Sequence, residues 1–198
     1  MIDGEIMKFY KKLVDNLFEL ASIAVTSVLA ITIIFTFLFR LVGVDGSSMV
    51  PTLSHRDWLI TATAVNDYEY KDIIIAVQPG ALNEPLVKRV IATEGQWIDV
   101  DYEAGVVRVG DTKETMVELE ENYIAEPATE RHSTDINEYP VQVPENCVFA
   151  MGDNRNNSLD SRSSLVGFID ERYILGKAMC RIISGQSGFD TEKFNIYE

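Results

Sequence analysis

The stretch Gly46-Ser47-Ser48-Met49-Val50-Pro51-Thr52-Leu53 lies between a long apolar run and a series of strand-like segments. Gly46 permits unusual φ values, whereas Pro51 restricts its own φ and biases Val50 toward an extended conformation. The backbone around Ser48 is therefore constrained on both sides, which suits a reactive hydroxyl. We interpret Ser48 as a candidate nucleophile; a Gly/Ser-rich turn without chemistry is the alternative.

A serine nucleophile needs a base, because its hydroxyl is a weak nucleophile at neutral pH. The chain has two histidines, His55 and His132, and lacks the Gly-x-Ser-x-Gly elbow of α/β-hydrolases. A His-based triad stays open, but no motif supports it. Lys88 is the other candidate, since in a strand it shares one face with Leu86 and Val90.

The surroundings of Lys88 decide whether its amine can act as a base. An ordinary lysine has a pKa of about 10.4 and is protonated at pH 7. Full burial lowers the pKa by roughly 3–5 units, into the range where the amine accepts protons. The alternative is an aliphatic stem on apolar surface with the amine in water. Arg89, on the other face, stays charged and is the poorer base.

Leu20–Phe39 contains 20 residues without a charge. As a helix with a rise of about 1.5 Å per residue, such a run spans about 30 Å, the thickness of the hydrocarbon core of a bilayer. A cleaved secretory signal would have a shorter apolar core followed by small residues, and here bulky residues follow. We predict a transmembrane helix over residues 20–42; a buried core helix is the alternative.

The charges that flank this run predict its orientation. Three lysines precede it and Arg40 alone closely follows it, so the positive-inside rule places residues 1–19 in the cytoplasm. Residues 43–198 then form an extracytoplasmic domain attached to the cell membrane. Ser48 lies nine residues past Phe39, a span of at most about 30 Å, so its site is expected near the outer membrane surface.

The segments after the serine stretch are rich in Val, Ile, Thr and aromatic residues and are separated by Gly, Pro, Asn or Asp turns. After residue 43, no amphipathic helix pattern is as strong as these strand patterns, so the predicted fold class is mainly β. The predicted strands are Asp57–Val65, Tyr70–Gln78, Pro85–Ala92, Gln96–Asp101, Gly105–Val109, Cys147–Met151 and Tyr173–Ile183.

Residues 99–145 carry thirteen carboxylates against three basic side chains. Gly, Pro and polar residues interrupt the pattern repeatedly, so we interpret this region as a solvated excursion from the core sheet. Recognition of basic partners by these carboxylates is the alternative. The net charge of −14 argues against nucleic-acid binding, which needs a basic surface.

The sequence predicts no metal site. Cys147 and Cys180 have no metal-ligand spacing, and we interpret them as buried free thiols, with a single disulfide left open. The polar stretch Gly152–Arg162 could suggest a calcium loop, but counting from Asp153 puts Arg155 at the third ligand position. It is better explained as a hydrogen-bonded polar turn.

Four blocks of this chain, in the same order and behind a membrane segment, resemble those of bacterial type I signal peptidases. They are Ser48–Leu53, Arg56–Ile60, Val87–Ile91 and Gly152–Arg162. The resemblance implies a membrane-bound Ser/Lys endopeptidase that removes signal peptides from exported preproteins, with a mainly antiparallel β catalytic core and no cofactor. It extends from residue 43 to about 183, with residues 99–145 as a short form of a variable insertion.

The resemblance also implies roles for individual residues. Ser48 is the nucleophile, with its backbone N–H in the oxyanion hole, and Lys88 is the base. The Ser158 hydroxyl hydrogen-bonds the Lys88 amine, whereas Asp160 and Arg162 form an ion pair that holds the loop. The structural residues of the same loop are Asp153, Asn154 and Asn157.

The substrate side of the site is predicted from the same resemblance. The family cleaves after a small residue, usually alanine, with another small residue two positions earlier. Some members use a serine hydroxyl two residues before the nucleophile as a second oxyanion donor, and Gly46 has none, so that donor stays open. The residues expected to line the shallow apolar pockets are Val44, Met49, Leu53 and Val87.

Two other functions are alternatives to signal-peptide cleavage. A catalytically silent membrane-anchored binding module would tolerate loss of Ser48 or Lys88, and both are present. A Ser/Lys self-cleaving repressor-type protease would need a DNA-binding segment where this chain has an apolar helix. The expected partners are therefore signal-peptide-bearing preproteins and the lipid bilayer, not nucleic acid. The preferred preproteins, the housekeeping or specialised role and the oligomeric state are not predicted.

Overall fold

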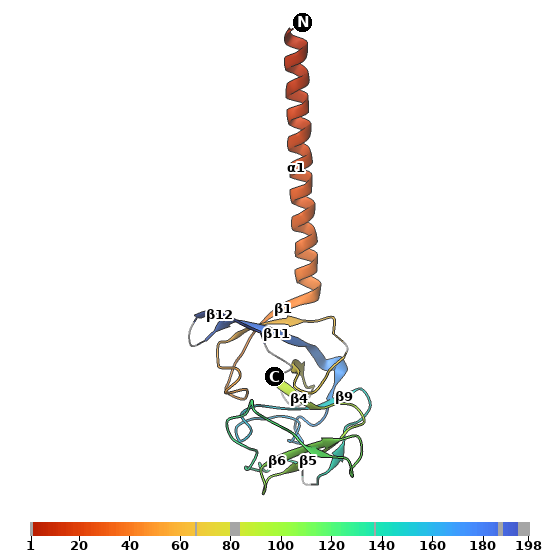
Figure 1. Ribbon diagram of the computed structural model, residues 1–198, viewed down its shortest axis with the longest axis vertical. Coiled ribbons are helices and arrows are strands. Elements are labelled where there is room, and N and C mark those ends of the chain that lie inside the picture. The colour runs from red at the N-terminus through yellow and green to blue at the C-terminus, as the bar shows by residue number, and fades with distance from the viewer. Residues whose placement is uncertain (1, 66, 80–83, 137, 186–187, 194–198) are drawn as a thin grey trace. The chain divides into compact units, whose positions relative to one another are not determined.

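The computed structural model describes residues 2–65, 67–79, 84–136, 138–185 and 188–193 (Figure 1). The chain divides into two compact units, Met1–Phe39 and Arg40–Glu198. The first contains helix α1, and the second contains the β-sheets.

Helix α1 runs from Ile2 to Leu38. The part from Ile6 to Leu38 contains an 18-residue window with a mean hydropathy of 2.3, so by length and composition the helix could cross a membrane. The hydroxyls of Thr26, Thr32 and Thr36 donate to backbone carbonyls one turn earlier. These three hydroxyls are thus satisfied within the helix, as an apolar surrounding requires.

The predicted membrane helix over 20–42 differs from the structure at both ends. The helix already begins at Ile2, and Phe39–Gly43 forms strand β1 instead of a last helical turn. Strand β1 pairs with β2, Trp58–Ala62. The Thr61 hydroxyl also donates to the Arg40 carbonyl at 3.1 Å. These partners are distant in sequence, and the uninterrupted apolar pattern gave no sign of them.

The larger sheet has eight strands in the order β1-β2-β11-β3-β4-β9-β10, with β12 pairing with β11. The registers described for its strand pairs are antiparallel, which agrees with the predicted fold class. Its other strands are β3 (Ile73–Val77), β4 (Pro85–Ala92), β9 (Cys147–Met151), β10 (Ile169–Asp170), β11 (Ile174–Ser184) and β12 (Gly188–Lys193). The 3₁₀ helix η1 (Glu171–Tyr173) connects β10 to β11. Each of the seven predicted strands overlaps one of the observed strands, and β6 and β11 each end one residue later than predicted.

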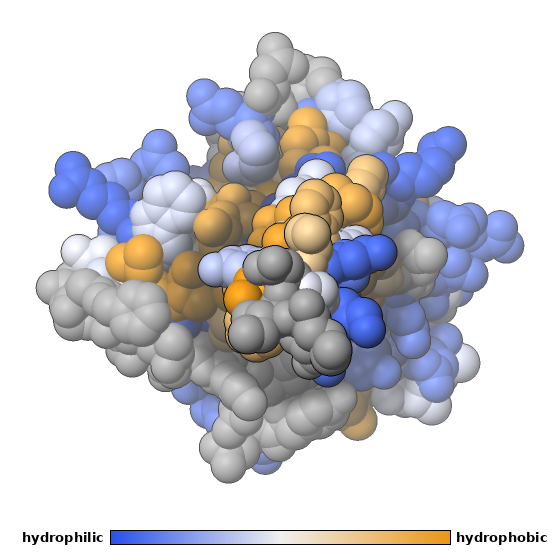
Figure 2. All heavy atoms as spheres, turned by 90° about the horizontal axis from the view of Figure 1, so that it is seen from above, coloured by the Kyte–Doolittle hydropathy of each residue, from blue (hydrophilic) through white to orange (hydrophobic). Residues whose placement is uncertain are grey.

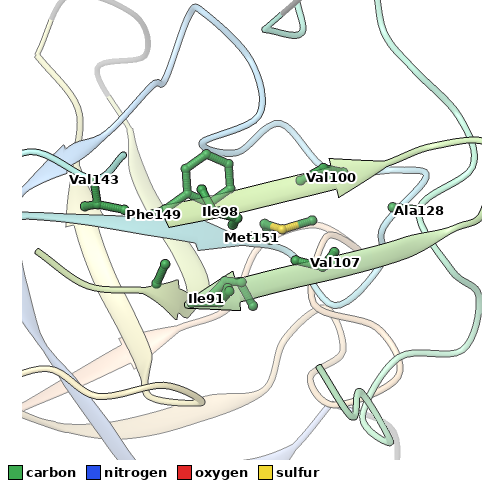
Figure 3. Close-up of a cluster of buried hydrophobic side chains, with 10 residues drawn as sticks. Ile91, Ile98, Val100, Val107, Ala128, Val143, Phe149 and Met151 are labelled. Carbon is green, nitrogen blue, oxygen red and sulfur yellow. The ribbon is translucent and has the colours of Figure 1, made fainter. Parts of the chain in front are cut away.

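A second sheet has four strands in the order β7-β6-β5-β8. They are β5 (Trp97–Asp101), β6 (Val106–Gly110), β7 (Val117–Glu118) and β8 (Val141–Gln142). Its inward side chains pack with those of β4 and β9 in one hydrophobic cluster, which includes Val100, Val107 and Phe149 (Figure 3). The interpretation of residues 99–145 as a solvated excursion is therefore wrong for β5 and β6, whereas both residues of β7 are exposed. Alternate residues of β5 and β6 are buried, and the polar positions between them obscured this pattern.

Two further hydrophobic clusters hold the sheet that positions the site. One gathers Ile74, Val90 and Ala150, and the other gathers Met49, Leu53 and Ile75 from the serine stretch and β3. Figure 2 shows hydrophilic residues mainly toward the edges of the view and hydrophobic residues near its centre. Both cysteines are free and partly exposed, so the predicted free thiols are found but are not fully buried.

Candidate active site

Ser48 lies in a compact turn between β1 and β2. The amide of Leu53 donates to the Met49 carbonyl at 2.9 Å, and both side chains are buried. The Asn154 amide donates to the Ser48 carbonyl at 3.0 Å, which joins the turn to the polar loop over residues 152–162. The buried side chains of Met49 and Leu53 and the hydrogen bond from Asn154 therefore fix the backbone of Ser48.

Lys88 approaches Ser48 from the middle of β4, where it pairs with Ile74 of β3. Its Nζ donates to Ser48 Oγ at 2.8 Å and to the Val87 carbonyl at 3.0 Å. The lysine is only 3% exposed. The fold thus brings a serine hydroxyl and a lysine amine from positions 40 residues apart into direct contact; we call these two groups the dyad.

Burial lowers the pKa of Lys88 to about 8, because a charged amine loses its hydration inside the domain. The carboxylates of Asp160 and Asp153 oppose this shift, and the Arg162 guanidinium adds to it. With such a pKa, about one amine in ten is neutral at pH 7. A neutral amine at this distance can accept the proton of the serine hydroxyl.

Ser158 and the Ser48 backbone both lie against Gly152. A Cβ placed on Gly152 would come within 2.2 Å of Ser158 Oγ and 2.4 Å of the Ser48 carbonyl oxygen, so each of them is in close contact with that glycine. Within the described residues, however, the hydrogen bonds of Lys88 Nζ go to Ser48 and Val87, and Ser158 is not a partner. The hydrogen bond expected between Ser158 and Lys88 is therefore not found in this structure.

A Gly152→Ala substitution is expected to lower kcat by about 100-fold, because the added methyl must displace Ser158 or the Ser48 backbone by roughly 1 Å. The matched control is Gly4→Ala, whose new methyl has nothing within 4 Å. Steady-state cleavage of a peptide substrate by both variants would test this. Equal kcat values for the two variants would contradict the close contact.

A buried ion pair stabilises the polar loop internally. Arg162 Nη2 donates to Asp160 Oδ2 at 2.8 Å, and both side chains are fully buried. The backbone N–H of Gly152 also donates to Asp160, at 2.9 Å. Burial alone would raise the pKa of Asp160, but Arg162 outweighs it and keeps the pKa below its usual value. The loop therefore contains a permanently charged pair next to the dyad.

Asp153 and Asn157 tie the same loop to the serine stretch. Asp153 accepts hydrogen bonds from Arg89 Nε at 2.8 Å and from the Thr52 hydroxyl. Asn157 Nδ2 donates to the Ser47 hydroxyl at 3.3 Å. Sequence reasoning missed Thr52 and the role of Arg89, because no local signal predicts that these side chains meet across the fold.

An open cleft of about 520 Å³ lies beside the dyad. Three of the four residues predicted to line substrate pockets are on its wall: Val44, Met49 and Val87. Leu53 is not on the wall, because it is fully buried in the cluster beneath. The wall also includes Val42, Pro85 and Leu86, which sequence reasoning did not select. The wall beside the dyad is thus apolar at these positions, and the carboxylates of Asp45 and Glu84 also line the cleft.

Gly46 has a φ of +96°, a conformation that favours glycine. Its N–H donates to His55 Nδ1 at 3.4 Å, and His55 also lies 3.0 Å from Asp45. Within the described residues neither histidine hydrogen-bonds Ser48, and the Ser48 N–H has no intramolecular acceptor. The residues around Ser48 thus provide a lysine in place of a histidine, with a backbone donor at the nucleophile itself. Among the residues described, no group of three His, Cys, Asp or Glu side chains could hold a metal ion.

A mainly β domain with a buried lysine amine against a serine hydroxyl in an open cleft defines a candidate serine hydrolase. A family model described as signal peptidase, peptidase S26, matches residues 17–183. The chain therefore belongs to the signal peptidase family, peptidase S26. This confirms the resemblance that the four sequence blocks indicate, and it makes the chain a protease.

Individual relatives agree with this assignment. Signal peptidase I of Bacillus licheniformis is 32% identical over 169 residues, which cover 82% of this chain and 86% of that protein. Probable signal peptidase I-1 of Synechocystis sp. is 36% identical over 149 residues, covering 70% and 68% respectively. A crystal structure of a signal peptidase I from Enterococcus faecalis aligns with a TM-score of 0.43 and 22% identity, over 58% of this chain and 98% of that one.

Proposed function

We propose that this protein is a membrane-bound Ser/Lys endopeptidase that removes signal peptides from exported preproteins through an acyl-enzyme. The observation that supports this most strongly is the 2.8 Å separation between Lys88 Nζ and Ser48 Oγ, with the lysine only 3% exposed. Family membership supports signal peptides as the substrate class.

In the first step, neutral Lys88 accepts the proton of the Ser48 hydroxyl while Oγ attacks the carbonyl carbon of the scissile peptide bond. The tetrahedral oxyanion accepts a hydrogen bond from the Ser48 N–H, and the second donor stays open. The lysine then gives its proton to the leaving nitrogen, and the bond to that nitrogen breaks. In the second step, Lys88 takes a proton from a water that attacks the carbonyl carbon of the acyl ester. The bond between that carbon and Ser48 Oγ then breaks, Lys88 returns the proton to Oγ, and the cleaved peptide leaves with a new carboxyl terminus.

We also propose that the loop over 152–162 supports the dyad and that the cleft accepts small side chains. Ser158 and the Ser48 carbonyl both contact Gly152, and the buried Asp160–Arg162 pair holds the loop. Val44, Met49 and Val87 provide an apolar wall for a small residue before the cleaved bond. The exclusion of larger side chains would set the cleavage position.

Helix α1 is proposed to anchor the chain in the cell membrane, with its N-terminus in the cytoplasm and the β domain outside. The apolar length of the helix and the basic residues before Leu20 support this orientation. The substrate would then be presented at the outer face of the bilayer, next to the apolar helix of its own signal peptide.

The substrate assignment is tested by incubating the detergent-solubilised protein with a preprotein and identifying the new N-terminus by mass spectrometry. We expect one cut directly after a small residue. Replacing that residue with phenylalanine in the preprotein should slow the cut by roughly 100-fold or more, since a shallow pocket cannot accept the ring. Cleavage at many unrelated positions, or equal rates for both substrates, would contradict the proposal.

A further inference from the structure

Glu121 and Tyr123 lie between β7 and β8, in the acidic region, and the proposed reaction does not use them. Glu121 nevertheless contacts Arg155 of the loop over 152–162. Arg155 Nη1 donates to Glu121 Oε2 at 2.6 Å, and Nη2 donates to the other carboxylate oxygen. The two side chains are 0% and 8% exposed. A buried ion pair with two hydrogen bonds fixes orientation as well as position.

The ring of Tyr123 stacks on a second arginine. The guanidinium carbon of Arg89 lies 4.0 Å from the ring centroid, and that of Arg155 lies over the same ring at 5.8 Å. The Tyr123 hydroxyl donates to Glu121 at 2.9 Å. Burial and the Glu121 carboxylate raise the pKa of Tyr123, so the phenol stays protonated and remains a donor. The acidic region thus contacts two buried guanidiniums at once.

Arg89 connects Tyr123, through Asp153, to the serine stretch over residues 46–53. It follows the dyad lysine on β4, and its Nε and Nη2 donate to the two oxygens of Asp153 at 2.8 and 2.6 Å. Asp153 in turn accepts a hydrogen bond from Thr52, four residues after the nucleophile. A continuous series of contacts therefore runs from Tyr123 through Arg89 and Asp153 to the turn that holds the reactive hydroxyl.

We propose that Glu121 and Tyr123 are positioning residues for peptide-bond hydrolysis. They hold Arg89 and the loop over 152–162 in the arrangement that keeps the Ser48 hydroxyl within reach of the lysine amine. This proposal rests on the proposed function. A displacement of about 1 Å at a reacting group can cost roughly 100-fold in rate, so contacts of this kind affect kcat without touching substrate.

The test compares kcat, KM and thermal unfolding for four variants of the full chain in detergent. Tyr123→Ala removes the stack, and we expect kcat per folded molecule to fall by about 10–100-fold with KM changed less than about threefold. Tyr123→Phe keeps the stack and should retain kcat within about threefold. Glu121→Gln removes the carboxylate charge that pairs with Arg155 and should also lower kcat. Val107→Ala, a buried residue of the same region, is the stability control.

A second readout does not depend on catalysis. The Asn154 amide donates to the Ser48 carbonyl at 3.0 Å, and its hydrogen exchange should become about tenfold faster in Tyr123→Ala. If Tyr123→Ala does not fold, Tyr123→Leu replaces it, because leucine retains apolar volume without a ring. Wild-type kcat together with wild-type exchange, or a loss of kcat equal to that of Val107→Ala, would overturn the proposal. If wild-type protein cleaves no preprotein, the proposed function fails, whereas the exchange measurement still tests the contacts.

Discussion

A Ser48→Ala variant is expected to process a preprotein roughly 10⁴-fold or more slowly than the wild type, because the acyl-enzyme cannot form without the hydroxyl. The fold should be unaffected, since the substitution removes one oxygen atom and leaves the turn intact. Time courses of precursor and mature product on a denaturing gel would measure the loss over a wide range of enzyme concentrations.

The matched control for this prediction is Ser47→Ala, which removes the neighbouring exposed hydroxyl and only its 3.3 Å hydrogen bond from Asn157. We expect this variant to keep its rate within about fivefold of the wild type. If Ser48→Ala processed the precursor as fast as Ser47→Ala, the nucleophile would have to be another residue.

A Lys88→Met variant is expected to lose about 10²–10⁴-fold in kcat, the usual contribution of general acid–base catalysis. Methionine fills a similar volume without an amine, so the buried β4 position keeps its packing. Single-turnover acylation, followed by mass spectrometry of the covalent intermediate, would measure the loss directly.

Lys177→Met serves as a control for the loss of an ordered lysine elsewhere. Lys177 pairs with the buried Asp72 at 2.6 Å, so its removal should lower thermal stability and leave kcat per folded molecule nearly unchanged. If Lys88→Met acylated as fast as Lys177→Met, the Lys88 amine could not be the base that activates Ser48.

Local signals in the sequence predicted seven of the strands and made Ser48 and Lys88 candidates, whereas the family resemblance joined these two residues as a dyad. Alternating apolar residues around Lys88 indicated a buried strand face, and the structure buries Val90 completely and Lys88 almost completely. The Gly and Pro residues that flank Ser48 likewise indicated a constrained turn. In both cases the signal lies within a few residues of the side chain concerned.

The differences arise where distant partners decide the structure. Phe39–Gly43 continues the apolar pattern of the helix, and only its pairing with β2 makes it a strand. In residues 99–145 the many carboxylates obscured the buried alternation at Val100 and Val107. The contacts of Tyr123 with Arg89 also join residues that no sequence spacing connects.

The pH dependence of kcat/KM tests the central claim, that a buried neutral amine activates Ser48. The substrate should lack groups that titrate between pH 6 and 10, so that the profile reports the free enzyme. Because burial lowers the pKa of Lys88 to about 8, the neutral fraction and the rate should rise with pH and level off above a midpoint near 8. A rate that is already constant from pH 6 upward, or a midpoint near the ordinary lysine value of about 10.4, would contradict the account.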